Sequence, residues 1–440
     1  MKKSIYNIEV MDDAELLIFN SLKGTYVKTK NNISLIQNIL NKPEKYINSK
    51  VTERLLELGF LTECENEREL AVFKFYESVY DKSLNLCIMP TEQCNFRCIY
   101  CYEKFEIGSL SEENIDGLLS WFRKNICNYK SVHISWFGGE PLLALRQIYE
   151  LSEQMIEVCK MHHKPYTASI TTNGYLLSED VFKRLLKCRV LQFHITIDGD
   201  KEKHNMQRLL GDGRPTYDNI IGNLVAISKN VKSKMFNIII RNNVTKNTLG
   251  SIHKFIDEMY QLFGQDARFG FYFRPVGKWE NTEFRMGEEE LIKNFDEMYE
   301  AILDAENHLN YAPYRNALEN QMCAAHKRNQ YVIRGDGRVG KCTMLLENSE
   351  NEVGKITPSG IHIEENKIIK WLGLSNRENA KCNNCNLYAS CFSNSCPAKG
   401  YILKSKNLCG YETKNVKYIL KLLNQSSVFV DLDEVYDYGY

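Results

Sequence analysis

Between residues 84 and 274, β-rich apolar runs alternate with amphipathic stretches of helical spacing. Short apolar runs that end at turn residues predict strands, whereas apolar positions three and four residues apart predict helices. The expected strands are Leu84–Met89, Val132–Phe137, Ala168–Thr172, Leu191–Ile197, Phe236–Asn242 and Arg268–Arg274. The expected helices are Glu112–Asn125, Leu145–His162, Ser178–Lys187, Asp218–Ser228 and Leu249–Phe263.

This alternation predicts an α/β fold. Six strand–helix repeats imply a parallel sheet with right-handed crossovers. Because six repeats are too few for a full eight-stranded barrel, we expect an open, partial (β/α)6 barrel of the TIM type. Chemistry in such folds belongs at the C-terminal ends of the strands, and a cysteine-rich loop follows the first expected strand there.

Residues 1–80 have a different pattern, in which short strands precede two helices. The expected strands are Tyr6–Val10, Leu16–Phe19 and 24–30, and the expected helices are Ile33–Leu40 and Asn48–Leu58. Gly59 is a suitable residue to end the second helix, and a strand or wing is expected at 60–62.

The rest of the chain divides into a cysteine-dense block and a tail. Residues 309–425 contain few long periodic segments, so this block is expected to fold around metal rather than by packing alone. Residues 426–440 are acidic and aromatic, and a frayed terminus is expected, with a contact to substrate or partner as the alternative. The predicted domains are therefore 1–80, 81–308 and 309–425, followed by this tail.

Composition and charge argue against several classes of protein. The 440 residues are 43% hydrophobic, and 56 Lys and Arg balance 56 Asp and Glu, so neither nucleic-acid binding nor disorder is indicated. Glu9, Asp12 and Asp13 replace the apolar run of a signal peptide, and no later run is long enough to span a membrane. We expect a cytoplasmic protein that binds neither nucleic acid nor membrane.

The chain has 15 cysteines. An odd count without a signal peptide argues against a disulfide framework, and clustered cysteines in the reducing cytosol are more often metal ligands. Ten of the 15 fall into spaced groups. The others are expected to be buried small side chains without chemistry, and they are Cys64, Cys87, Cys127, Cys159 and Cys188.

The run Cys94-Asn-Phe-Arg-Cys98-Ile-Tyr-Cys101 carries the most specific chemical signal. Thiolates are the soft ligands that iron–sulfur clusters need, and three of them hold three irons of a cubane [4Fe–4S] cluster. Such a site normally has four cysteines, so one iron is left without a protein ligand. A three-cysteine zinc site or three buried thiols are the alternatives.

This run resembles the cysteine motif of the radical SAM superfamily. The resemblance implies that S-adenosylmethionine (SAM) chelates the open iron and is cleaved reductively to a 5′-deoxyadenosyl radical, which abstracts an unactivated hydrogen. Cys94, Cys98 and Cys101 are then the catalytic metal ligands. A reductase such as flavodoxin or ferredoxin is implied as the electron donor.

Residues after the later strands also match the superfamily pattern. The loops 171–174 and 196–199 resemble its ribose-facing loops, and the guanidinium of Arg208 suits the SAM carboxylate. Glycines let a backbone approach a ligand closely, as the motif that binds the SAM amino group requires. The implied SAM contacts are Gly138, Gly139 and Glu140 at the amino group, Tyr100 beside the adenine, and Asn173, Thr196 and Arg208.

A second cysteine block spans residues 323 to 409. From Cys382 to Cys396 its gaps are two, five and four residues, which resembles the SPASM extension of radical SAM peptide-modifying enzymes, where the last gap is usually three. The resemblance implies two auxiliary [4Fe–4S] clusters, and therefore three clusters in the chain. The outer cluster would be held by Cys382, Cys385, Cys391 and Cys409, and the inner one by Cys323, Cys342 and Cys396.

The inner set has three cysteines, because none lies between Cys323 and Cys342. An open iron that binds a substrate thiolate and a non-cysteine protein ligand are both compatible with this pattern. Two zinc sites are the alternative to iron–sulfur clusters in the block.

Residues 1–80 resemble, in element order and length, the winged-helix domain that binds the leader of a ribosomally made precursor peptide. Such a domain takes the leader as an added strand at a sheet edge, and a structural cap is the alternative. The chain thus resembles radical SAM/SPASM peptide maturases of the ranthipeptide, sactipeptide and streptide types. The expected product is an intrapeptide crosslink: a thioether if the inner cluster is open, and a carbon–carbon or carbon–oxygen bond if it is closed.

Two other functions are alternatives. Anaerobic sulfatase-maturating enzymes form formylglycine; they lack the N-terminal domain and usually have an aspartate base after the cysteine corresponding to Cys342, where this chain has Thr343. A non-catalytic iron–sulfur electron carrier or peptide-binding scaffold is the third hypothesis, which cleavage of SAM by the reduced protein would exclude.

Overall fold

The structure is a computed structural model and describes residues 1–277, 291–292, 295–305, 308–373, 382, 384–392, 396–403 and 409–436. Its contacts divide the chain into two compact units. Unit 1 comprises Met1–Tyr80, Tyr311–Lys327 and Leu372–Tyr440, and unit 2 comprises Asp81–Asn310 and Arg328–Trp371. Among the described residues, no helix is long and apolar enough to cross a membrane.

Unit 2 is built on a large sheet whose described strands run in the order β11-β10-β9-β8-β7-β6-β12-β13-β14-β15. Neighbours from β11 to β12 pair in parallel. The first strands of this series are β6 (Ser83–Ile88), β7 (Ser131–Trp136), β8 (Tyr166–Thr172), β9 (Val190–Thr196), β10 (Asn237–Val244) and β11 (Phe269–Pro275). The expected strands coincide with β6 to β11, so the α/β fold with a large parallel sheet is confirmed.

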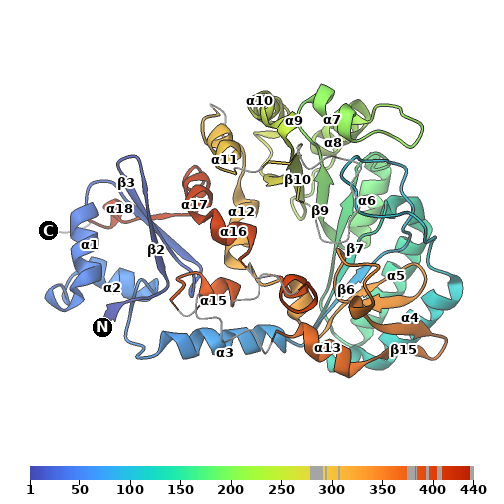
Figure 1. Cartoon of the computed structure of the whole chain (residues 1–440), viewed down its shortest axis with the longest axis horizontal. Helices are drawn as coiled ribbons and strands as arrows, with labels where there is room; N and C mark the ends of the chain where they lie inside the picture. The colour runs from blue at the N-terminus through green and yellow to red at the C-terminus, as the bar shows by residue number, and fades with distance from the viewer. Residues whose placement is uncertain are drawn as a thin grey trace. The chain divides into compact units, whose positions relative to one another are not determined.

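Amphipathic helices follow the parallel strands, and Figure 1 shows α4, α5 and α6 together on one side of β6 and β7. The side chains of Ser111, Ser178 and Asp200 cap the N-termini of α4, α6 and α7 by accepting backbone N–H bonds. The helices are α4 (Glu112–Asn125), α5 (Leu145–Met161), α6 (Glu179–Lys187), α7 (Lys201–Gln207), α8 (Tyr217–Asn230), α9 (Lys246–Leu249), α10 (Ile252–Phe263), α11 (Asp296–Leu303) and α13 (Glu365–Trp371).

Residues 328–371 extend the same sheet, although the sequence assigned them to the C-terminal block. β12 (Gln330–Ile333) pairs in parallel with β6, and antiparallel strands continue beyond it. These are β13 (Arg338–Gly340), β14 (Glu352–Thr357) and β15 (Gly360–Ile363). The predicted block 309–425 is therefore divided between the two units, because β12 pairs with β6 and so belongs to the sheet of unit 2.

A buried ion pair ties this extension to the loop after β6. Arg334 donates from Nε to Oε1 of Glu92 (3.0 Å) and from Nη2 to Oε2 (2.7 Å), and the side chains are 3% and 7% exposed. The backbone N–H of Gly335 adds a third bond to Glu92. Two parallel bonds of this kind fix both partners in one geometry.

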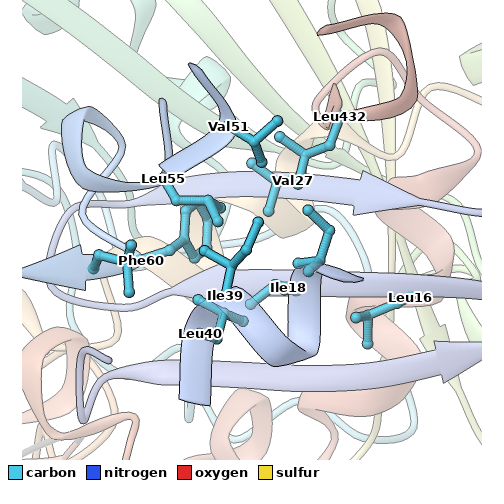
Figure 2. Close-up of a cluster of buried hydrophobic side chains, with 11 residues drawn as sticks. Leu16, Ile18, Val27, Ile39, Leu40, Val51, Leu55, Phe60 and Leu432 are labelled. Carbon is cyan, nitrogen blue, oxygen red and sulfur yellow. The ribbon is translucent and has the colours of Figure 1, made fainter. Parts of the chain in front are cut away.

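The N-terminal part of unit 1 is a small sheet covered by two helices. Its described strands run β16-β4-β3-β2, and a separate pair joins β1 to β5. Leu16, Ile18 and Val27 of the sheet pack against Ile39 and Leu55 of the helices (Figure 2). The elements are β1 (Lys2–Lys3), β2 (Asn7–Asp12), β3 (Glu15–Asn20), β4 (Thr25–Thr29), β5 (Leu61–Thr62), β16 (Val430–Asp431), α1 (Ile33–Asn41) and α2 (Lys50–Glu57).

One helix of this region was not predicted. α3 (Glu67–Val79) buries Ala71, Phe75 and Val79 on one face, and the side chain of Asn66 caps it by accepting from the backbone of Glu69. An Asn three residues before a Glu is a sequence signal for a helix start. The other α-helices among the described residues of unit 1 are α12 (Ala312–Glu319), α15 (Tyr388–Cys391), α16 (Tyr411–Lys414), α17 (Val416–Asn424) and α18 (Asp433–Tyr436).

The prediction of a frayed C-terminal tail was wrong for the described residues up to 436. β16 joins the N-terminal sheet next to β4, and α18 (Asp433–Tyr436) follows it. In Figure 1 this red segment runs from α17 to the blue N-terminal elements. The reason is packing, because Leu432 is fully buried in the core shown in Figure 2.

Candidate functional site

The three-cysteine loop follows β6 at the C-terminal edge of the parallel sheet, as the sequence predicted. Backbone bonds fasten this loop to the end of α7 and the segment after it: Arg97 N donates to Leu209 O (2.9 Å), Ile99 N to Gln207 O (3.1 Å) and Gly211 N to Asn95 O (2.8 Å). A loop bonded at three positions along its length keeps its cysteines in a defined arrangement.

Gly138 and Gly139, after β7, lie directly against this loop. A Cβ atom on Gly138 would collide with the carbonyl oxygen of Thr91, and one on Gly139 with that of Gln93. Gly138 also has a φ of 111°, which side chains rarely adopt. Since Glu140 N donates to Gln93 O at 2.8 Å, the two loops are joined by their backbones.

Glu140 is fully buried and connects this loop to the loop after β8. Its Oε1 accepts from Thr172 Oγ1 (2.7 Å) and Leu142 N (3.0 Å), and its Oε2 accepts from Asn173 N (2.7 Å). Burial raises the pKa of Glu140, although these bonds lower it. Its carboxylate is thus occupied by protein donors, and its predicted contact with the SAM amino group stays a prediction.

Asn173 and Thr196 lie at the ends of neighbouring strands. Asn173 donates from Nδ2 to Oδ1 of Asn95 in the cysteine loop, at 2.8 Å. Thr196 is the last residue of β9 and pairs in register with Arg241 of β10. The structure therefore brings Asn173 to the cysteine loop and Thr196 to the same edge of the sheet.

A buried polar network joins Tyr100 to Arg208. The hydroxyl of Tyr100 donates to Oδ2 of Asp198 and accepts from Arg208 Nη1 (2.6 Å) and from Asn243 Nδ2 (3.1 Å). Asp198 also accepts from Asn243 N at 2.8 Å. Burial raises the pKa of Tyr100 well above its usual value, so the phenol keeps the proton that it donates. The network couples the cysteine loop to the ends of β9 and β10.

Asn243 was not identified from the sequence, and Asp198 was included only as part of the loop 196–199, without a role of its own. Both stand at the carboxyl ends of neighbouring parallel strands, where a functional site of this fold is expected. Polar residues at those positions were the signal that could have identified them.

The backbone of Arg208 is fixed by Thr216, which is in turn in contact with His204. Its backbone oxygen accepts from Thr216 Oγ1 (2.6 Å), and Thr216 in turn contacts His204 Nε2 (3.1 Å). Arg208 is 6% exposed, and its Nε has no hydrogen-bond partner among the described residues. An unpaired buried guanidinium N–H is unfavourable unless a ligand accepts from it.

The thiols of the loop are suited to bind a metal cluster and not to act as free nucleophiles. Burial raises the pKa of Cys94 and of Cys101 to about 12, so both stay protonated unless a bound cation stabilises the thiolate. In the described part of the chain, no three His, Cys, Asp or Glu side chains are grouped to hold a single metal ion. A cubane cluster differs from such an ion, because each cysteine binds a different iron.

Glu103, two residues after the loop, is a further buried carboxyl group. Its pKa is raised to about 8, chiefly by burial and also by the charge of Glu92, while Arg334 opposes the shift. Its Oε2 has no hydrogen-bond partner within the described residues. The sequence gave no reason to single it out.

The predicted outer cluster residues all lie in unit 1, where α3 supports part of them. Arg68 of α3 donates from Nη1 to the carbonyl of Cys382 (3.1 Å), and its guanidinium lies 3.1 Å from the ring centre of Tyr388. Cys385 N donates to Cys382 O, and Cys391 ends α15. Cys409 also belongs to unit 1 and is exposed.

The predicted inner cluster residues come from both units. Cys323 and Cys396 belong to unit 1 and Cys342 to unit 2. Cys342 is fixed by Asn351, whose Oδ1 accepts from Cys342 N and whose Nδ2 donates to Cys342 O, both at 2.8 Å. The ligand sets of both auxiliary clusters stay predictions.

Comparison with known proteins identifies the domain that carries the cysteine loop. Residues 88–256 match the Radical SAM superfamily, and this range includes the loop, the two glycines and Arg208. The chain contains a radical SAM domain. The prediction of a radical SAM enzyme with an α/β fold is thereby confirmed, and the domain implies SAM and a [4Fe–4S] cluster as cofactors.

Named relatives of this radical SAM protein include maturating enzymes. A cysteine-type anaerobic sulfatase-maturating enzyme of Clostridium perfringens is 26% identical over 70% of this chain and 87% of its own length. The radical SAM cyclopropyl synthase TigE of Paramaledivibacter caminithermalis is 25% identical over 52% of this chain and 54% of its own. Among solved structures, native anSMEcpe with bound AdoMet and Cp18Cys peptide has a TM-score of 0.58 and 21% identity, covering 78% of this chain and 97% of that one.

The residues of the radical SAM domain fit its cofactors. Cys94, Cys98 and Cys101 would hold the cluster, and the orphaned Nε of Arg208 together with the close approach allowed by Gly138 and Gly139 suits an amino acid ligand. When bound, the cluster and SAM supply the electron and the carbon radical for hydrogen abstraction. The chain's own contribution is to join the loops that hold both groups.

Substitution of Arg208 is expected to weaken SAM binding selectively. Arg208→Lys keeps the charge but loses Nε and the planar fork, so the dissociation constant of SAM should rise about ten- to a hundredfold, as expected for loss of a charge-assisted bond. Equilibrium dialysis against the anaerobic, iron-loaded protein measures this.

Arg214→Lys is the matched control, because Arg214 is a surface residue whose partner is Asp212. Equal affinities for the two variants would show that Arg208 serves only the fold.

Proposed function

We propose that this chain is a radical SAM enzyme that oxidises a side chain of a peptide or protein substrate. The observation that carries the proposal is the joined set of loops around Cys94–Cys101, Gly138–Glu140 and Arg208 within a matched radical SAM domain. The peptide bound in the similar anSMEcpe structure supports the substrate class. The electron donor is proposed to be a small reductase such as flavodoxin or ferredoxin.

The residues of the site have distinct roles in this proposal. The cysteines hold the cluster, and Arg208 receives the carboxylate of SAM. Tyr100 and Asp198 keep Arg208 in place through their shared proton, and Glu140 holds the loop of Asn173 against the cysteine loop. Glu140, Asp198 and Arg208 are buried, which keeps water away from the groups that position the cofactor.

The first specific candidate is oxidation of the sulfatase-maturating type. It is supported by relatives of that name, which match this chain over 87% of their length at 26% identity. In this candidate a cysteine of the substrate becomes formylglycine. Thr343 stands where such enzymes usually have an aspartate, so another group would have to take the proton.

The second candidate is formation of an intrapeptide crosslink on a precursor with a leader. The N-terminal sheet with α1 and α2 supports it, because a sheet edge beside a helix can accept an extended peptide. This chain is also larger than anSMEcpe, of which 97% is covered by only 78% of this chain. Two auxiliary [4Fe–4S] clusters, held by the seven cysteines that the resemblance to the SPASM extension implies, belong to both candidates.

A mass measurement separates the candidates. Anaerobic protein is given SAM, dithionite and the Cp18Cys peptide, or a short peptide encoded beside the gene, and 5′-deoxyadenosine is quantified. Conversion of cysteine to formylglycine removes two hydrogens and exchanges sulfur for oxygen, whereas a crosslink removes two hydrogens and keeps the sulfur. Each peptide with its cysteine replaced by alanine is the control. Absence of 5′-deoxyadenosine with every peptide would contradict the proposed function.

A further inference from the structure

The C-terminal segment of this chain occupies one edge of the N-terminal sheet as a short added strand. β16 pairs in parallel with β4, with Val430 opposite Val27 and Asp431 opposite Lys28. Leu432 N continues the ladder by donating to Lys28 O at 2.9 Å. Backbone bonds of this kind are independent of sequence and give an extended peptide its affinity.

The side chain of Leu432 fills an apolar pocket of the same domain. It is fully buried among residues of the sheet and both helices, and Figure 2 shows it beside Val51 and Val27. Val430 also packs against this cluster but is only partly buried. A single apolar anchor next to a backbone ladder is the pattern by which a sheet edge selects one side chain of a peptide.

The carboxylate of Asp433 occupies a cradle of donors before α1. It accepts from Thr29 Oγ1 (2.6 Å), Lys30 N (2.8 Å), Asn31 N (3.0 Å) and Asn32 Nδ2 (2.9 Å). Burial would raise the pKa of Asp433, but the bond from Thr29 and the other bonds outweigh it and lower the pKa to about 2. The site is therefore specific for an anionic group directly after the apolar anchor.

These contacts come from four consecutive residues, 430–433. Residues 425–429 join them to α17, and Ser427 in this connection is exposed. A short segment with one fully buried side chain opens at a lower free energy than the core of a domain. The occupant is thus a tethered peptide that another peptide can replace.

We propose that this edge of β4, with the Leu432 pocket and the Asp433 cradle, is a peptide-binding site for extended segments of the form apolar–Asp–Leu–Asp, and that the chain's own tail competes for it. The identity of the partner rests on the proposed function: it is a segment of the peptide substrate that carries the same anchor and carboxylate. The tail then holds the site until a matching substrate displaces it.

A fluorescent peptide with the sequence of residues 427–434, Ser-Val-Phe-Val-Asp-Leu-Asp-Glu, tests this on the full chain. Anisotropy is measured with the unsubstituted protein and with Leu432→Asp, which places a carboxylate in the apolar pocket and so releases the tail. Apparent affinity scales with the fraction of open sites, so Leu432→Asp should bind the probe at least about tenfold more tightly. Ser427→Asp adds the same charge to the tail outside the strand and should bind like the unsubstituted protein.

A second variant covers the case in which Leu432→Asp unfolds the domain. Asp433→Asn leaves the anchor in place and weakens only the cradle contacts, and it should also bind the probe more tightly than the unsubstituted chain. Equal binding by Asp433→Asn and the unsubstituted chain would overturn the proposal, as would binding of a probe whose own leucine is replaced by aspartate. The assay contains neither SAM nor iron, so its outcome is independent of the chemistry assigned to unit 2.

Discussion

Replacing Cys94, Cys98 and Cys101 together by alanine is expected to abolish SAM cleavage. Without these thiolates the chain cannot hold the cluster from which the electron comes, so formation of 5′-deoxyadenosine should fall by at least about a thousandfold. The iron content of anaerobically reconstituted protein should fall as well, from about twelve to about eight per chain, because each [4Fe–4S] cluster carries four. Chromatography of the nucleoside and an iron and sulfide assay measure both.

Cys159 and Cys188 provide matched controls for this experiment, because both are buried cysteines of the same unit that stand outside the loop. Cys159→Ala and Cys188→Ala should keep SAM cleavage and the full iron content. If the triple variant retained its iron, the loop would not be the site of the cluster. If the unsubstituted chain held only about four irons, with zinc in the C-terminal block, the two auxiliary clusters would be excluded.

Replacing Arg334 by alanine is expected to destabilise unit 2 by about 3–5 kcal/mol, because it leaves the carboxylate of Glu92 buried without its partner. The pair is 3% and 7% exposed and has two short bonds, so little solvent screens it. Glu92 stands two residues before Cys94, and the loss should therefore also reduce cluster retention. Urea unfolding followed by circular dichroism measures the change in free energy.

Arg338→Ala is the control for the loss of an arginine in the same hairpin. Arg338 pairs with Asp336 at 26% and 34% exposure, and such a pair contributes at most about 1 kcal/mol. The double variant Arg334→Met with Glu92→Leu should recover much of the lost stability, because it removes both buried charges. A loss below about 1 kcal/mol for Arg334→Ala would mean that Glu92 finds water or another donor.

Most of unit 2 was predictable because its signals are local. Each strand of the series β6 to β11 is an apolar run between turn residues, and the cysteine spacing of the loop is a chemical signal that needs no tertiary information. The polar network around Tyr100 and Arg208 was harder to predict from the sequence. Asp198 and Asn243 are ordinary residues in the sequence, and their proximity follows only from the parallel pairing of β9 and β10.

The contacts of the C-terminal tail could not be predicted from its sequence at all. Asp431, Asp433 and Glu434 surround Leu432 with charge, which is typical of a solvated end. Asp433 accepts a hydrogen bond from Thr29, which lies 404 positions away in the sequence. The pocket for Leu432 is formed by residues of the N-terminal sheet and helices, which are also distant from the tail in sequence. No periodicity in the tail contains that information, because a two-residue strand is too short to have one.

The pairing of β12 with β6 sets a limit on how evolution can recombine this protein. Backbone donors at Asn85 and Met89 are satisfied by carbonyls of Asn329 and Ile333. A gene fusion that joined residues 81–310 to the C-terminal part of another protein would remove β12 from the edge of β6. The N–H and C=O groups of that edge could then pair with strands of other molecules. A shortened chain that is to keep the β6 edge covered therefore has to retain residues 328–371 together with residues 81–310.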